Sequence, residues 1–222
     1  MCGRFTLLAR LASLQERYKV AYTSENYSPN YNSYNVAPTQ IIPTVTSSSA
    51  KNILSSMRWS FSVGPNTVIN ARDDKLISTK TYFDALCNNR CLIPADGFYE
   101  WKLVGDKKIP QYIRLKTTEI FSFAGIYQYN TKALENPFGT AILTTIPNDL
   151  VANVHNRMPV ILPPQGELDW LNSNSSVEKL QNLLVPYPTE EMEMYQVSPK
   201  VNSAKNNSPD LIKPISSLTK FF

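Results

Sequence analysis

Four segments with strand-like composition in the middle of the chain constrain its fold more than any other feature. Each is rich in isoleucine, valine, threonine and aromatic residues, and turn-forming stretches such as "GDKK" separate them. They cover residues 90–104, 109–116, 120–129 and 138–146. A strand-dominated order with few helices predicts an α+β fold, with a curved antiparallel sheet or a barrel-like core and flanking helices.

The rest of the chain adds a few helices and loops to this core. Apolar side chains recur at helical spacing in residues 6–19, where Thr6 suits a helix N-cap. We expect further helices at 79–89 and 175–184, strands or strand–loop junctions at 55–63 and 66–72, and a loop at 22–35. No repeat or linker divides the chain, which predicts one domain over 2–215 and a short tail over 216–222.

Composition narrows the class of protein. Hydrophobic residues make up 42% of the chain, enough for a substantial core. No apolar run reaches the roughly 18 residues of a membrane-spanning helix, and "MCGRFTLLAR" is too short for a secretory signal. We therefore expect an intracellular monomer, nuclear in a eukaryote or in the cytoplasm or nucleoid of a bacterium. A net charge of +4 is only mildly basic, so an anion-binding surface must come from grouped arginines and lysines.

Cysteine usage argues against both a disulfide scaffold and a metal site. Three cysteines are too few for a secreted disulfide framework, and an odd number would leave one of them unpaired. A single histidine and the absence of a C-x-x-C motif make a structural zinc site unexpected. We interpret Cys87 and Cys91 as small buried hydrophobic residues, and we expect no cofactor.

Cys2 stands directly behind the initiator methionine. Removal of Met1 would free an α-amine that titrates at about 7.7–8.0, next to the cysteine thiol. Such a 1,2-aminothiol reacts with an aldehyde: the amine forms a Schiff base, and the thiol closes a five-membered thiazolidine. An internal cysteine cannot do this because its nitrogen is an amide. From position alone, an ordinary N-terminal residue remains the alternative.

Three further motifs contain side chains suited to chemistry. The only histidine, His155, lies in "HNRMPVIL", and Glu100 lies between two aromatic residues in "PADGFYEW". Burial against aromatic rings raises a carboxyl pKa and suits it to proton transfer. Asn70 and Arg72 lie in "INARDDK", where an amide can orient a substrate and an arginine can grip a phosphate. The alternatives are a structural histidine and a surface acid.

The motifs together resemble the signature of the SRAP family, the SOS-response-associated peptidase-like proteins that shield abasic sites in DNA. The resemblance spans residues 2 to about 215, and several blocks are long and uncommon. It rests on "MCGRF", "YNVAPTQ", "MRWS", "INARDDK", "RCLIPADGFYEW", "FAGIY", "ILTTIPN", "HNRMPVIL" and "VSPKVN", in that order.

The resemblance implies a specific reaction. In that family the mature N-terminal cysteine crosslinks to the ring-opened aldehyde of an abasic deoxyribose in single-stranded DNA. Carried over, Cys2 is the nucleophile and Asn70 positions its amine or the sugar. Glu100 is the proton shuttle at the imine, and His155 helps to open the sugar ring. Lyase activity and reversal of the crosslink are related possibilities.

The same motifs predict a DNA-binding surface. Arg4, Arg72 and Arg157 each lie in a catalytic motif and are expected to hold phosphates. Lys80 stands where the family often has arginine, which keeps the charge but loses the bidentate fork. Trp59 is expected either to stack on a base beside the lesion or to pack in the core.

The end of the chain, "ISSLTKFF", has the spacing of a sliding-clamp binding peptide. Leu218, Phe221 and Phe222 would face one apolar pocket on a single helical turn. Such peptides usually have glutamine where this chain has Ile215, and a packed or frayed terminus is the alternative.

Three functions therefore remain open. The first is covalent shielding of abasic sites in single-stranded DNA. The second is a cysteine peptidase that uses Cys2 and His155, at least to remove its own leader residue. The third is a non-catalytic binder of single-stranded nucleic acid, for which Cys2 would be dispensable.

Overall fold

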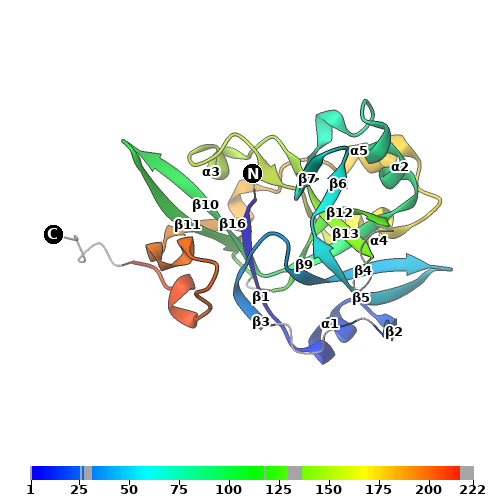
Figure 1. Cartoon of the computed structure of the whole chain (residues 1–222), viewed down its shortest axis with the longest axis horizontal. Helices are drawn as coiled ribbons and strands as arrows, with labels where there is room; N and C mark the ends of the chain where they lie inside the picture. The colour runs from blue at the N-terminus through cyan, green and yellow to red at the C-terminus, as the bar shows by residue number, and fades with distance from the viewer. Residues whose placement is uncertain (1, 26, 28–31, 118, 130–136, 216–222) are drawn as a thin grey trace.

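Two large β-sheets, a two-stranded hairpin and five short helices make up the described part of the chain, which confirms the expected α+β fold (Figure 1). The computed structural model describes residues 2–25, 27, 32–117, 119–129 and 137–215. None of the helices in these ranges is both long enough and apolar enough to cross a membrane.

The larger sheet bends into a nearly closed ring. Within the described residues it has nine strands, and β13 pairs with β5 in parallel as well as with its sequence neighbour β12. Gly139 makes this closure possible, because a Cβ there would lie 2.2 Å from the Ser60 carbonyl oxygen. The strand order is β14 (Met158–Pro159), β13 (Phe138–Thr145), β12 (Phe121–Tyr129), β9 (Arg90–Ala95), β4 (Ile41–Ser48), β5 (Lys51–Trp59) and β2 (Val20–Thr23), with β15 (Ile161–Leu162) on β12 and β8 (Asn70–Arg72) on β13.

The smaller sheet is antiparallel and has five strands in the ordered chain. Its order is β16 (Met192–Gln196), β11 (Lys107–Leu115), β10 (Gly97–Val104), β1 (Arg4–Leu8) and β3 (Asn32–Val36). The predicted "GDKK" turn joins β10 to β11, and Gly105 adopts the φ of +57° that this tight connection requires. A separate hairpin pairs β6 (Phe61–Val63) with β7 (Asn66–Val68).

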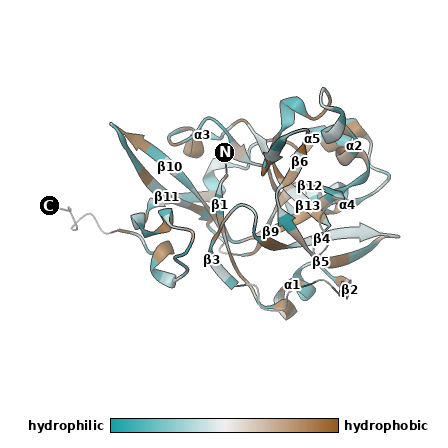
Figure 2. Cartoon of the chain, in the orientation of Figure 1, coloured by the Kyte–Doolittle hydropathy of each residue, from teal (hydrophilic) through white to brown (hydrophobic). Residues whose placement is uncertain are grey.

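Strand β1 belongs to the smaller sheet and places Phe5 and Leu7 in the main hydrophobic core. Figure 1 shows it in the middle of the molecule, beside the β10–β11 hairpin. The ring of Phe5 packs edge-on against Trp59 at 5.0 Å and against Phe123 at 5.9 Å. Figure 2 shows hydrophobic colouring on the central strands such as β9 and polar colouring at the periphery. The aromatic core therefore holds the N-terminal strand in place.

Helices and short 3-10 turns cover the ends of the sheets. Ser176 and Asn148 cap α5 and α3 by accepting hydrogen bonds from Lys179 and Val151 backbone amides. The elements are α1 (Leu11–Arg17), α2 (Lys80–Asn88), α3 (Asp149–Ala152), α4 (Pro164–Leu171), α5 (Val177–Asn182), η1 (Asp73–Lys75), η2 (Thr189–Glu191), η3 (Pro199–Asn202) and η4 (Pro209–Ile212).

The prediction of a helix from residue 6 was wrong. Residues Arg4–Leu8 form a strand and the helix begins only at Leu11, because β1 is hydrogen-bonded to β10 on one side and β3 on the other. The expected loop at 22–35 contains the end of β2 and most of β3, and strands β4 and β16 were not predicted. The helices expected at 79–89 and 175–184 are confirmed as α2 and α5, and the four middle segments are confirmed as strands.

Candidate active site at the N-terminal strand

Cys2 is fully buried two residues before β1, where a hydrogen bond ties it to β8. The Asn70 side chain donates from Nδ2 to the Cys2 carbonyl oxygen at 2.9 Å. Asn70 is held by the register of β8 against β13, where it pairs with Ile142. The fold therefore joins two predicted site residues that are far apart in sequence.

The Cys2 thiol is kept in its neutral form. Burial raises its pKa far above the usual range, and the Glu100 carboxylate raises it further. Its Sγ lies 3.8 Å from the Arg4 carbonyl oxygen, a weak contact for a thiol donor. A neutral thiol differs from the thiolate that cysteine proteases use as nucleophile.

Glu100 and His155 line one cavity of about 490 Å³. Glu100 lies on β10 and is only 3% exposed, and burial raises the pKa of its carboxyl group. His155 follows α3, and burial lowers the pKa of its imidazole. Both groups are therefore shifted toward their neutral forms.

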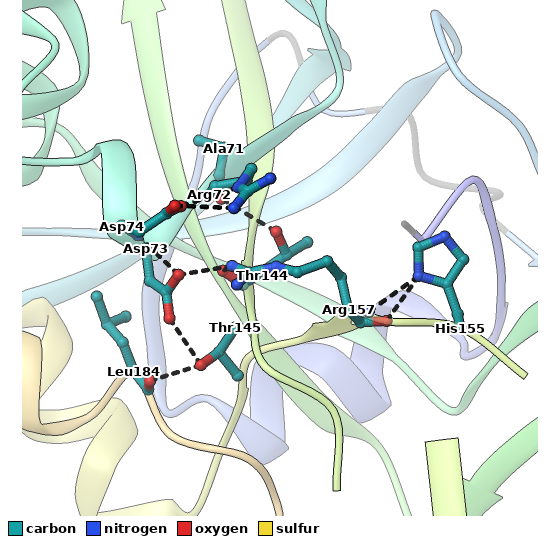
Figure 3. A network of polar contacts seen from close by, with 9 residues as sticks. All are labelled: Ala71, Arg72, Asp73, Asp74, Thr144, Thr145, His155, Arg157 and Leu184. Atoms are coloured by element: carbon teal, nitrogen blue, oxygen red, sulfur yellow. Dashed lines mark hydrogen bonds and ion pairs between the residues drawn. The ribbon is translucent and has the colours of Figure 1, made fainter. Parts of the chain in front are cut away.

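The backbone of Arg157 sets the hydrogen bonding of the His155 ring. The Arg157 N–H donates to Nδ1 at 3.0 Å, which favours the neutral tautomer that carries its proton on Nε2. Figure 3 shows this contact within a larger polar network that reaches from His155 to β8.

Two buried polar atoms at the site have no hydrogen-bond partner among the described residues. They are Oδ1 of Asn70 and Nε of Arg157. An unsatisfied buried donor or acceptor costs about 1–3 kcal/mol, and such atoms are rare in folded proteins. Neither Asn70 nor Arg157 is among the residues that line the cavity.

The expected phosphate ligands have protein partners. Arg157 is buried, and its Nη2 donates to Asp73 Oδ1 at 2.6 Å. Arg4 donates to the Asn35 side chain at 2.8 Å and to the Val201 carbonyl at 2.9 Å. These contacts give both arginines a role in the fold that the sequence did not predict.

Arg72 and Lys80 lie at the surface. Arg72 forms a two-pronged ion pair with Asp74, with bonds of 2.9 and 2.8 Å. Lys80 is the first residue of α2 and pairs with Asp84, one helical turn away, at 2.6 Å.

Trp59 does not offer a face to a base, so the stacking role predicted for it is wrong. Its side chain is 0% exposed, and its Nε1 donates to the Ile69 carbonyl oxygen at 2.9 Å. Closure of the ring through β5 forces the side chain into the core, as the alternative interpretation expected.

Three cavity residues were missed by sequence reasoning: Trp101, Lys108 and Asn202. Trp101 is partly exposed, and its Nε1 donates to Asn202 Oδ1 at 2.8 Å. Its position next to Glu100 was an available signal. Lys108 reaches the cavity only because β11 pairs with β10, which no local pattern reveals.

The remaining candidates lie elsewhere. Cys91 is buried with its pKa raised to about 12 by burial, as expected for an inert residue, whereas Cys87 is half-buried. In the described ranges no cluster of three His, Cys, Asp or Glu side chains is arranged to hold a metal. The clamp-like residues Leu218, Phe221 and Phe222 lie outside the described residues.

Comparison with known proteins identifies the family of this chain. The model of the SOS response associated peptidase family matches residues 1–204. The abasic site processing protein YoqW of Bacillus subtilis is 43% identical, over 96% of this chain and 99% of its own. The abasic site processing protein YedK of Escherichia coli is 26% identical, over 97% and 100%. A crystal structure of a Bacteroides thetaiotaomicron protein superposes with a TM-score of 0.85 at 26% identity, over 97% of this chain and 100% of that one. The chain belongs to the SOS response associated peptidase (SRAP) family.

Proposed function

We propose that this protein processes abasic sites in single-stranded DNA by forming a thiazolidine crosslink through Cys2. The observation that carries the proposal is the hydrogen bond from Asn70 to the Cys2 carbonyl, next to a cavity lined by Glu100 and His155. The names of YoqW and YedK, both abasic site processing proteins, support the choice of substrate.

The reaction begins with opening of the sugar ring. Opening moves one proton from the C1′ hydroxyl group to O4′ and exposes an aldehyde at C1′. A carboxylate can accept the hydroxyl proton and return it to O4′, while a neutral imidazole that carries its proton on Nε2 can stabilise O4′ with a hydrogen bond. His155 and Glu100 supply these two groups.

Crosslinking then joins both nucleophiles of Cys2 to C1′. After Met1 is removed, the α-amine adds to the aldehyde, and the carbinolamine loses water to give an imine. Protonated Glu100 donates the proton that leaves with this water, which its raised pKa favours. The thiol then adds to the imine carbon, and its proton goes to the ring nitrogen. The net products are a thiazolidine and one water.

A neutral thiol suits this order of events. The amine attacks first, and the sulfur is needed only once an imine is present. A cysteine peptidase instead needs a thiolate at the start, which the raised pKa of Cys2 disfavours. The same imine makes β-elimination of the 3′ phosphate easier, and reversal of the crosslink would use the same Glu100 and His155.

DNA contacts follow from the mouth of the cavity. Trp101 is partly exposed there and can stack on a neighbouring base, and Lys108 supplies a positive charge for a phosphate. Arg72 is exposed on the same polar network as Arg157 and can exchange its carboxylate partner for a phosphate.

The test is incubation with single-stranded DNA that contains one abasic site, followed by a denaturing gel. Wild-type protein should give a heat-stable shifted band, and DNA without the lesion should give none. Cys2→Ala should abolish the band and leave weak, salt-sensitive binding, while Cys87→Ala should behave as wild type. Cys2→Ser should give a less stable product, because an oxazolidine is weaker than a thiazolidine.

Two results would contradict the proposal. One is a band of normal intensity from Cys2→Ala, which would fit the non-catalytic binder with only adventitious crosslinking. The other is retention of Met1 in the active protein, measured by mass spectrometry, because the amine would then belong to methionine. Cleavage of an unrelated peptide that depends on Cys2 would favour a peptidase instead.

A further inference from the structure

We infer that Asp73 is a positioning residue that sets the protonation geometry of His155 by holding Arg157. Asp73 lies outside the reacting groups, immediately after β8, and the function proposed above assigns it no role. Figure 3 shows the path from its carboxylate through Arg157 to the imidazole.

Both oxygens of Asp73 are engaged. Oδ1 accepts from Arg157 Nη2 at 2.6 Å, and Oδ2 accepts from the Thr145 hydroxyl at 2.7 Å. Thr145 is itself anchored, 2.9 Å from the Leu184 carbonyl oxygen. The carboxylate is therefore held from two sides in a fixed orientation.

The ion pair between Asp73 and Arg157 is shielded from water. Their side chains are 22% and 9% exposed, so the attraction is screened far less than in a surface pair. Arg157 Nη2 also donates to the Thr144 carbonyl on β13. The guanidinium is thus fixed to both η1 and β13, and the backbone of Arg157 is fixed with it.

Arg157 in turn presents two backbone atoms to one nitrogen of His155. Its N–H donates to Nδ1 at 3.0 Å, and its carbonyl oxygen lies 3.2 Å from the same Nδ1. The N–H is the partner when Nδ1 is bare, and the carbonyl can accept when Nδ1 gains a proton. His155 therefore keeps a hydrogen bond at Nδ1 in either state, as long as Arg157 stays in place.

The neighbouring acid provides a matched control. Asp74 has the same charge and follows Asp73 directly, but its carboxylate pairs with Arg72 at the surface, where both side chains are about half exposed. Sequence alone does not distinguish the two acids, whereas the structure connects only Asp73 to Arg157 by a hydrogen bond.

The first measurement is the ¹⁵N spectrum of the imidazole in protein labelled at histidine. The chain has one histidine, so each ring nitrogen gives a single signal. Wild type should show a bare Nδ1 and a protonated Nε2. Asp73→Asn should add a population protonated at Nδ1, because the released Arg157 no longer holds its N–H against the ring. Asp74→Asn should leave both signals unchanged.

The second measurement is the crosslinking rate at saturating abasic-site DNA. This measurement, unlike the first, rests on the proposed function. Asp73→Asn should lower the rate about 10-fold, a part of what a well-placed acid–base group contributes. Noncovalent affinity for the DNA should not fall, because Arg157 loses a competing carboxylate. A merely structural defect would lower both the crosslinking rate and the noncovalent affinity for the DNA. Asp74→Asn should keep the wild-type rate.

Thr145→Val gives a second variant if Asp73→Asn folds poorly. It removes the hydroxyl that holds Oδ2 and should shift the imidazole signals in the same direction by a smaller amount. Wild-type tautomer signals in both variants would overturn the inference. If wild type itself formed no crosslink, the proposed function would fail, while the imidazole spectrum would still decide the role of Asp73.

Discussion

Glu100 and His155 show how single residues are tuned at this site. Burial raises the pKa of the carboxyl group and lowers that of the imidazole, so both tend toward the neutral form. A neutral acid can donate a proton, and a neutral imidazole that carries its proton on Nε2 can donate a hydrogen bond from that nitrogen. Paired groups whose environments shift their pKa values in opposite directions are typical of acid–base sites.

Replacing Glu100 with glutamine should stabilise the protein at neutral pH. Because the pKa of Glu100 is raised on folding, the folded state binds its proton more tightly than the unfolded state does. The stabilisation from this group is complete below the ordinary glutamate pKa and is lost as pH rises through the folded-state pKa. Urea unfolding of Glu100→Gln should therefore give a higher midpoint than wild type near pH 8 and an equal one near about pH 4.

The exposed Glu16→Gln variant is the control and should show no such pH-dependent difference. Crosslinking by Glu100→Gln should be slower at every pH, because the amide cannot transfer a proton. A variant that is less stable than wild type at pH 8 would show that the carboxylate stabilises the fold.

At the scale of elements, one buried arginine joins two helices to the ring. Arg90 opens β9 and donates to the carbonyls of Cys87 at 2.7 Å and Trp170 at 2.7 Å. It also donates to the Leu86 and Asn172 carbonyls, so the last turns of α2 and α4 share one cation. Positive charge at helix C-termini is favourable, because the free carbonyls there carry partial negative charge.

Arg90→Leu should destabilise the protein strongly. The variant keeps the apolar contacts but leaves several helix-end carbonyls without a donor, and we expect a loss of about 3 kcal/mol. In a chain of this size that corresponds to a fall in melting temperature of roughly 6–12 °C. Scanning calorimetry measures it. The control is Lys80→Ala, which breaks only the exposed pair with Asp84 and should cost less than about 0.5 kcal/mol. If the two variants lost the same stability, this role of Arg90 would be contradicted.

At the scale of the whole molecule, Asn35 and Arg4 join the N-terminal strands to residues 201–206. Asn35 Nδ2 donates to the carbonyls of Ser203 at 3.0 Å and Asn206 at 2.9 Å, while its Oδ1 accepts from Arg4. The segment around η3 is thereby held over a second apolar cluster, formed by Tyr99, Tyr112, Val197, Val201 and Leu211. η3 also ends at Asn202, which lines the cavity. The hydrogen bonds of Asn35 therefore connect the packing of this segment to the candidate site.

Asn35→Ala should loosen residues 199–206 before the rest of the protein. The change leaves several buried polar groups without a partner and should lower the free energy of unfolding by about 2–3 kcal/mol. Hydrogen exchange read by mass spectrometry should speed up in this segment and remain slow in the nine-stranded ring. Gln15→Ala, which removes an exposed side-chain bond to Thr23, should leave both unchanged. If residues 199–206 exchanged as slowly in Asn35→Ala as in wild type, the proposed role of Asn35 in holding this segment would be contradicted.

Much of the fold could be predicted from local pattern. Strands in the middle of the chain follow from their composition, and α2 follows from its helical spacing. The first strand could not be predicted, because "TLLARLASL" fits a helix as well. Pairing with β10 and β3, far along the chain, decides that residues Arg4–Leu8 are extended.

The covalent chemistry proposed for Cys2 follows from sequence alone, since only the residue behind Met1 can acquire a free amine beside its thiol. Tertiary structure decided the partners and the burial. It placed Trp59 inside the core, brought Trp101 and Lys108 to the cavity, and linked Asp73 rather than Asp74 to Arg157. The physical reason is that hydrogen bonds and desolvation depend on distance in space, and the groups concerned lie tens to more than a hundred residues apart.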